Sequence, residues 1–118
     1  MQTETFAMSA EYCLVLSTCP EGEAAAALAR CLVEERLAAC VNVLPGLTSV
    51  YPWQGAIETG KETLLLIKTE KSLYPQLERR LRERHPYELP EIVAIPIERG
   101  LPDYLQWISQ WLAHAPSP

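Results

Sequence analysis

The chain is short and acidic. Its 118 residues are 48% apolar and carry a formal net charge of −5, which suits one hydrophobic core and leaves no room for two. The ten lysines and arginines are dispersed apart from four arginines within residues 79–84, so the composition argues against nucleic acid as a partner. No apolar run approaches the roughly 20 residues of a membrane-spanning helix, and the first ten residues lack the positive charge of a secretion signal.

We therefore expect a single domain over residues 11–113, with flexible tails at 1–10 and 114–118, in a cytoplasmic protein without membrane contact. The cysteines agree with that location, because none forms a C-x-x-C pair or a zinc-ribbon spacing and reduced thiols are normal in a cytoplasm. They are Cys13, Cys19, Cys31 and Cys40.

The first predicted strand is the apolar run 12–18, whose almost continuous hydrophobicity is typical of a central strand. Thr18 and Glu21 have capping-box spacing and Pro20 suits a first helical turn, so a helix is predicted to start there. Its apolar side chains recur with helical spacing at Ala25, Leu28, Ala29, Leu32 and Val33.

Two long strands follow at 38–51 and 56–69, joined by turn residues. Pro45-Gly46 interrupts the first of them and predicts a bulge or a sheet edge. Arms of about 14 residues greatly exceed the typical strand of about 5 or 6. The outer half of such a hairpin leaves apolar side chains and unpaired edges bare, so we expect a symmetric oligomer, with a cyclic trimer as one closed solution. The predicted oligomer-interface residues are Val50, Tyr51 and Trp53.

Three further elements complete the chain. A helix capped by Ser72 is predicted to end at Arg84, a short strand follows over 92–97, and an amphipathic helix runs from Leu101 to Leu112. Pro96 confines the short strand to a sheet edge. The order predicts an α+β fold, a ferredoxin-like split βαββαβ antiparallel sheet with an extra C-terminal helix, in which the first and third strands are central.

The segment 85–91, HPYELPE, places an imidazole, a phenol and two carboxylates between two prolines. Because Pro86 and Pro90 fix their own φ angles and restrict the residues before them, the polar groups are displayed on a stiff backbone. This segment predicts a binding or structural site, whereas Pro86 alone would indicate only a helix stop.

Four stretches resemble the divalent-cation tolerance family known as CutA: LAACVNVLPGLTSVYPWQGAIE, LLLIKT, HPYELPEIVAIPI and DYLQWI. The resemblance runs in register from Tyr12 to Leu112. It implies a ferredoxin-like homotrimer of PII-like architecture, associated with tolerance of copper and other divalent cations.

The resemblance also implies metal ligands, because a strand-end cysteine and a pair of histidines have been taken as copper ligands in some relatives. This chain has Ser17 and Arg84 at two of those positions and keeps only His85. Cys19 lies two residues beyond and could substitute for the missing thiol, since copper favours thiolates and imidazoles. The expectation is therefore copper or another divalent cation at His85 and Cys19, with none tightly bound. The alternative for His85 is a cation at the negative end of a helix dipole.

A ligand cleft between subunits is the competing interpretation, with a small metabolite as ligand and an unknown protein as partner of a PII-like adaptor. Its residues would be Glu58, Glu62, Lys68, Tyr87, Glu91 and Trp107. Convergent polar groups beside aromatic rings are typical of such clefts, although an intersubunit salt-bridge network would use the same charges.

Catalysis is not expected. An acylphosphatase shares this topology, but it needs a glycine-rich phosphate cradle where this chain has Ser17-Thr18-Cys19-Pro20. Cys19 could act as a nucleophile at a helix N-terminus, yet the sequence places neither His85 nor His114 near it. We expect a binding or sensor protein.

Overall fold

The computed structural model describes residues 10–113 of the chain. Its elements are β1 (Tyr12–Pro20), α2 (Glu23–Glu34), β2 (Cys40–Trp53), β3 (Ala56–Glu70), a 3₁₀ turn (Lys71–Leu73), α3 (Tyr74–Arg84), β4 (Val93–Ile97) and α4 (Pro102–Leu112). The predicted tails lie outside the described residues apart from Ala10, and the domain boundaries stay a prediction. None of the helices in the described range is long and apolar enough to cross a bilayer.

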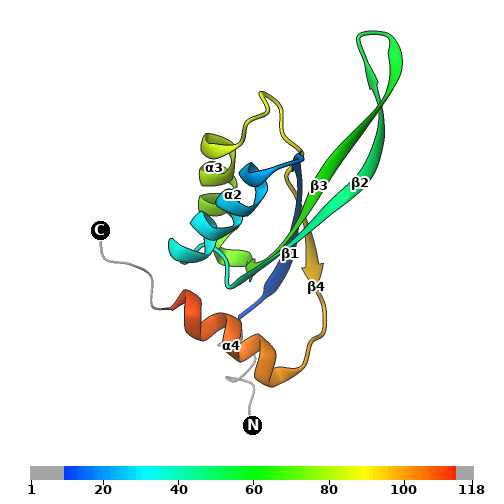
Figure 1. The fold of residues 1–118 in the computed structure, drawn as a ribbon. Helices are drawn as coiled ribbons and strands as arrows, with labels where there is room; N and C mark the ends of the chain where they lie inside the picture. Colours follow the sequence, from blue (N-terminus) through cyan, green and yellow to red (C-terminus); the bar gives the residue numbers. More distant parts are fainter. Residues whose placement is uncertain (1–9, 114–118) are drawn as a thin grey trace.

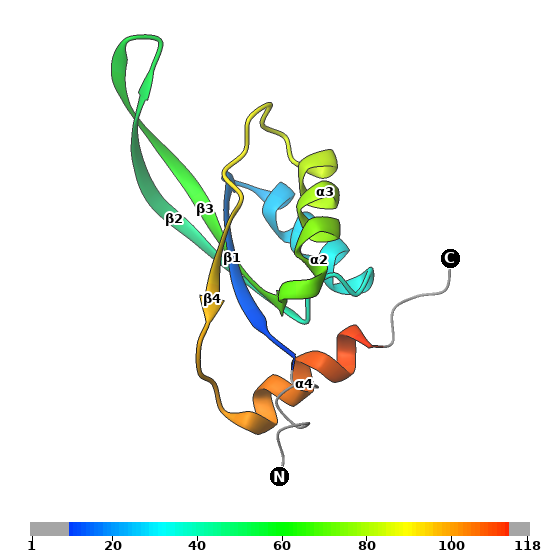
Figure 2. The ribbon, with the colours of Figure 1, turned by 180° about the vertical axis from the view of Figure 1, so that it is seen from behind.

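The four strands form one antiparallel sheet in the order β2-β3-β1-β4. The predicted ferredoxin-like α+β fold is confirmed, with the first and third strands central and the strands that contain Pro45 and Pro96 at the edges. Helices α2 and α3 lie side by side against the sheet, while α4 packs across one end of it (Figure 1). Figure 2 shows the same arrangement from behind.

The predicted start of the first helix is wrong. Thr18 and Pro20 do not cap a helix but continue β1, where they pair with Leu64 and Glu62 of β3. Helix α2 begins only after Gly22, whose φ of 114° is accessible to glycine. Pairing along a central strand therefore overrides a local capping motif. Ser72 likewise lies in the 3₁₀ turn before α3 and makes no cap hydrogen bond.

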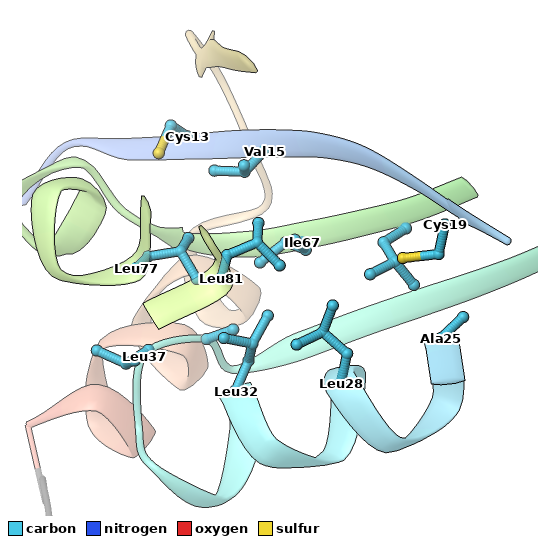
Figure 3. Packing of buried hydrophobic residues seen from close by; sticks show 12 residues of the cluster. Cys13, Val15, Cys19, Ala25, Leu28, Leu32, Leu37, Ile67, Leu77 and Leu81 are labelled. Atoms are coloured by element: carbon cyan, nitrogen blue, oxygen red, sulfur yellow. The ribbon is translucent and has the colours of Figure 1, made fainter. Parts of the chain in front are cut away.

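The main core lies between the sheet and the α2–α3 layer. Alternate residues of β1 are buried, as expected for a strand with one face on the core. They meet leucines from both helices (Figure 3). The buried cluster comprises Cys13, Val15, Cys19, Ala25, Leu28, Leu32, Leu37, Ala38, Leu65, Ile67, Leu77 and Leu81.

A second, smaller cluster holds α4 to the end of the sheet, where Ala39 packs with Ile108 and Leu112. The Arg36 guanidinium lies 3.3 Å from the centre of a Trp111 ring and donates a 3.0 Å hydrogen bond to the Trp111 carbonyl. The indole N–H of Trp111 donates to the carbonyl of Val33, also at 3.0 Å. These contacts tie the end of α2 to the end of α4.

The β2–β3 hairpin projects well beyond the helices (Figures 1 and 2). Pairing with β1 stops at Glu62, whereas β2 and β3 continue together to the Trp53–Ala56 pair. The predicted irregularity at Pro45-Gly46 is present as a register shift between Leu44 and Leu47. The molecule consequently measures 57 × 30 × 21 Å, elongated along the hairpin.

Apolar side chains near the hairpin tip lie in water in the single chain. Val50 is 66% exposed, Tyr51 42%, Trp53 60% and Ile57 73%. Soluble monomers rarely leave apolar groups of this size together on an uncovered strand pair. The predicted interface residues Val50, Tyr51 and Trp53 are thus all exposed, and their role in association stays a prediction.

Candidate functional site

His85 occupies the junction between α3 and the proline-flanked loop. It ends α3 with extended backbone, as expected before Pro86, and its side chain is buried. Its Nε2 lies 2.8 Å from the carbonyl oxygen of Thr18, and its Nδ1 accepts a 3.0 Å hydrogen bond from the Tyr87 N–H. Since a carbonyl only accepts, Nε2 carries the proton and Nδ1 does not. The imidazole is neutral and joins the loop to the end of β1.

The pKa of His85 is lowered from its ordinary value because burial disfavours the charged ring. The Thr18 carbonyl and the Glu62 carboxylate oppose this shift without reversing it. His85 is thus unsuited to the alternative role of a cation at the C-terminal end of α3.

Cys19 is the direct neighbour of His85, although the two are far apart in the sequence. Its Sγ lies 3.6 Å from His85 Nε2, and both side chains are buried. Burial, helped by the negative charge of Glu62, raises the pKa of the Cys19 thiol to about 11. The sulfur is therefore protonated at neutral pH, which is the reverse of what a cysteine nucleophile needs.

The structure brings the two predicted metal ligands together, but the pair does not fit a preformed copper site. Both ring nitrogens of His85 are engaged by the backbone, and Cys19 holds its proton. Residues 10–113 contain no cluster of three or more His, Cys, Asp or Glu side chains able to hold a metal ion. Copper binding here would require rearrangement of the imidazole and loss of the thiol proton.

We predict that Cys19 in the folded protein reacts far more slowly with iodoacetamide than in urea and shows no plateau near neutrality, because its side chain is fully buried and burial raises the pKa of its thiol to about 11. Peptide mass spectrometry measures the rate at this site. In urea the same thiol should titrate near its ordinary value of 9.0. A plateau near neutrality in the folded protein would contradict the assignment and revive a catalytic role.

Ser17 is unusual because its buried hydroxyl lacks a hydrogen-bond partner among the described residues. It is fully buried on the core face of β1, two residues before Cys19. A buried hydroxyl without a partner costs roughly 1–3 kcal/mol.

Ser17→Ala should therefore raise the free energy of unfolding by about 1 kcal/mol, measured by urea titration at fixed protein concentration. Thr69→Val is the matched control, because the buried Thr69 hydroxyl donates a 2.7 Å hydrogen bond to the Leu37 carbonyl. That change should destabilise by about 1 kcal/mol. Equal losses from both variants would show that Ser17 is satisfied after all.

Among the predicted cleft residues, Glu62 and Tyr87 are in direct contact within the single chain. The Tyr87 hydroxyl donates a 2.7 Å hydrogen bond to Glu62, and the Tyr87 and His85 rings lie 5.0 Å apart. The pKa of Tyr87 is raised, first by burial and then by this bond to a carboxylate. The bond anchors the proline-flanked loop to the base of the hairpin.

The other predicted cleft residues lie elsewhere. Lys68 has its ammonium 5.8 Å from the Tyr104 ring, which stacks on Trp107 at 5.6 Å. Lys68 and Glu62 are six residues apart on β3, or about 20 Å along the strand. Glu58 is exposed opposite Tyr51 in the hairpin, and Glu91 is exposed in the loop before β4. One chain alone does not assemble these six residues into a single cleft.

Sequence reasoning missed Tyr104, although its place beside Trp107 on one helix face was a usable signal. It could not have found the Thr18 carbonyl as a partner of His85, because a backbone group has no sequence signature. Tyr104 and Trp107 belong to a wider exposed apolar set on the sheet and α4, together with Leu44, Val93, Ile95 and Leu101.

The fold and these surfaces define a class: a ferredoxin-like α+β protein with an uncovered hairpin and a proline-flanked loop fixed to it. Residues 13–111 match the family model described as CutA1 divalent ion tolerance protein. The chain belongs to this family, as the resemblance of its motifs implied.

Similar proteins agree with that assignment. The chain is 52% identical over 97 residues to the divalent-cation tolerance protein CutA of Thermus thermophilus, covering 82% of this chain and 94% of that protein. It is 50% identical to the mouse protein CutA over 79% of this chain, but it spans only 52% of the mouse protein.

Solved structures give the same result. The crystal structure of CutA from Xylella fastidiosa superposes with a TM-score of 0.84 at 48% identity, covering 86% of this chain and 97% of that one. The Thermus thermophilus structure gives a TM-score of 0.80 at 52% identity, covering 82% and 94%.

Proposed function

We propose that this protein is a cytoplasmic, homotrimeric binding protein that acts in divalent-cation tolerance without catalysis. The observation that carries the proposal is the hairpin, which is paired beyond Glu62 only with itself and carries exposed aromatics. In a symmetric oligomer, a second copy of the chain would pair with the open strand edge and cover the exposed aromatic side chains. Light scattering at micromolar concentration tests it, and a monomeric mass would refute it.

Copper is the first cation to consider, because Cys19 and His85 lie within contact distance and offer a thiol and an imidazole. The competing hydrogen bonds of His85 argue for weak, reversible binding and against a resident metal. On this view the chain responds to an excess of cation and carries no fixed cofactor.

Calorimetric titration of the metal-free protein with Cu²⁺ should give heat that falls sharply in His85→Ala. His114→Ala is the control, since it removes the other imidazole of the sequence and should titrate like the unaltered protein. Equal heats from the unaltered protein and His85→Ala would eliminate a His85-centred copper site.

The second candidate function is that of a PII-like adaptor that binds a small metabolite between subunits. The Tyr87–Glu62 hydrogen bond favours it, because that bond fixes a polar loop at the base of the hairpin where a neighbouring subunit would arrive. Native mass spectrometry of the purified oligomer tests it: a retained small molecule should be lost in Tyr87→Phe. An oligomer carrying nothing in either form would reject it.

A further inference from the structure

A hollow of about 900 Å³ lies between α4 and the end of the sheet, remote from the His85 region. Both polar and apolar side chains line this hollow. The polar lining residues are Tyr12, Glu70, Ser72, Gln106 and Ser109, and the apolar ones include Leu73, Leu105 and Leu112. The volume falls within the range of about 300–1,000 Å³ that is typical of small-molecule sites.

Three of these polar residues form a continuous hydrogen-bonded network. Tyr12 and Glu70 are partners in the β1–β3 register, and Ser109 of α4 bonds to both. Ser109 donates its one hydroxyl proton to the Glu70 carboxylate, so the 2.6 Å contact with Tyr12 must be donated by the phenol. This directionality means that every proton in the network points toward Glu70.

Glu70 is half-buried and has no cationic partner among residues 10–113. The four ion pairs of the described residues leave it out, and the neighbouring Lys71 is instead 3.2 Å from Glu11. A carboxylate with leucines around it and no counter-ion attracts a cation, since charge-assisted hydrogen bonds are stronger where water is partly excluded. The second carboxylate oxygen remains to accept from a ligand.

We infer that this hollow is a binding site for a small organic ammonium ion, with the ammonium on Glu70 and a compact apolar body against Leu73, Leu105 and Leu112. A bare metal ion would leave the apolar wall unused, and an anion would meet the carboxylate. The hollow shares no residue with the proposed copper ligands Cys19 and His85.

Benzylamine is a suitable probe, with benzyl alcohol as its uncharged counterpart. We expect benzylamine, titrated into the ¹⁵N-labelled protein, to shift the amides of residues 70–73 and 105–112 and to bind about tenfold more tightly than benzyl alcohol. Glu70→Gln should lower benzylamine affinity about tenfold and leave the alcohol unchanged. Glu98→Gln, in a neighbouring hollow, should behave like the unaltered protein.

If Glu70→Gln fails to fold, comparing the affinities of benzylamine and benzyl alcohol for the unaltered protein still tests whether the hollow prefers a cation. Equal affinity for the two probes would overturn the inference. So would an unchanged benzylamine affinity in Glu70→Gln, or amide shifts confined to other parts of the protein.

Discussion

A variant in which Val50, Tyr51 and Trp53 are all replaced by serine is expected to be monomeric while keeping its fold. The three side chains are between 42% and 66% exposed in the single chain, so their removal takes nothing from its core. Complete burial of a large apolar side chain is worth about 1.5–3 kcal/mol, and these three are about half exposed, so the loss is at least about 2 kcal/mol per subunit, or roughly 30-fold in affinity. Size-exclusion chromatography with light scattering measures the change.

Leu101→Ser is the control for this experiment. Leu101 is 70% exposed at the start of α4, so the substitution removes a comparable apolar group without touching the hairpin. It should leave the mass unchanged. The hairpin assignment fails if the triple variant keeps the mass of the unaltered protein, provided that circular dichroism shows both to be folded.

The second large effect is expected from the core. Leu81→Ala should lower the free energy of unfolding by about 2–5 kcal/mol, because Leu81 is fully buried between α3 and the sheet and its truncation leaves a cavity. Leu89→Ala makes the same chemical change at a position 86% exposed in the proline-flanked loop, and it should cost less than about 0.5 kcal/mol.

Urea titrations of the two leucine variants must use one protein concentration, because the stability of an oligomer depends on it. A small loss for Leu81→Ala would mean that the core relaxes around the missing atoms. A large loss of unfolding free energy for Leu89→Ala would instead indicate that Leu89 is buried against another copy of the chain.

Much of the fold could be predicted from the sequence because several local signals agreed. Apolar runs marked the two central strands, and Pro45 and Pro96 marked the two edges. The error at Thr18 has a simple cause: a capping box is worth about 1 kcal/mol, whereas extending β1 along β3 gains several backbone hydrogen bonds and buries Cys19.

The site was less predictable. The sequence identified His85, Tyr87 and Glu62 as polar residues of interest, but their partners depend on which strand end the loop meets. The contact between Cys19 and His85 joins residues 66 positions apart and follows from β1 continuing to Pro20. Glu58, Lys68 and Glu91 lie apart in the single chain, and only an oligomer of the proposed kind would bring them together.

The clamp between Arg36 and Trp111 has a consequence for how the chain acquires its structure during synthesis. Every fully buried residue of the main core has been made once Leu81 is synthesised, whereas Val33, Arg36 and Ala39 meet their partners Trp111 and Leu112 only at the end of the chain. A nascent chain can therefore collapse early around its first two helices. Its last helix then closes over a seat that includes Ala39 of the first half of the chain and Leu73 of the second.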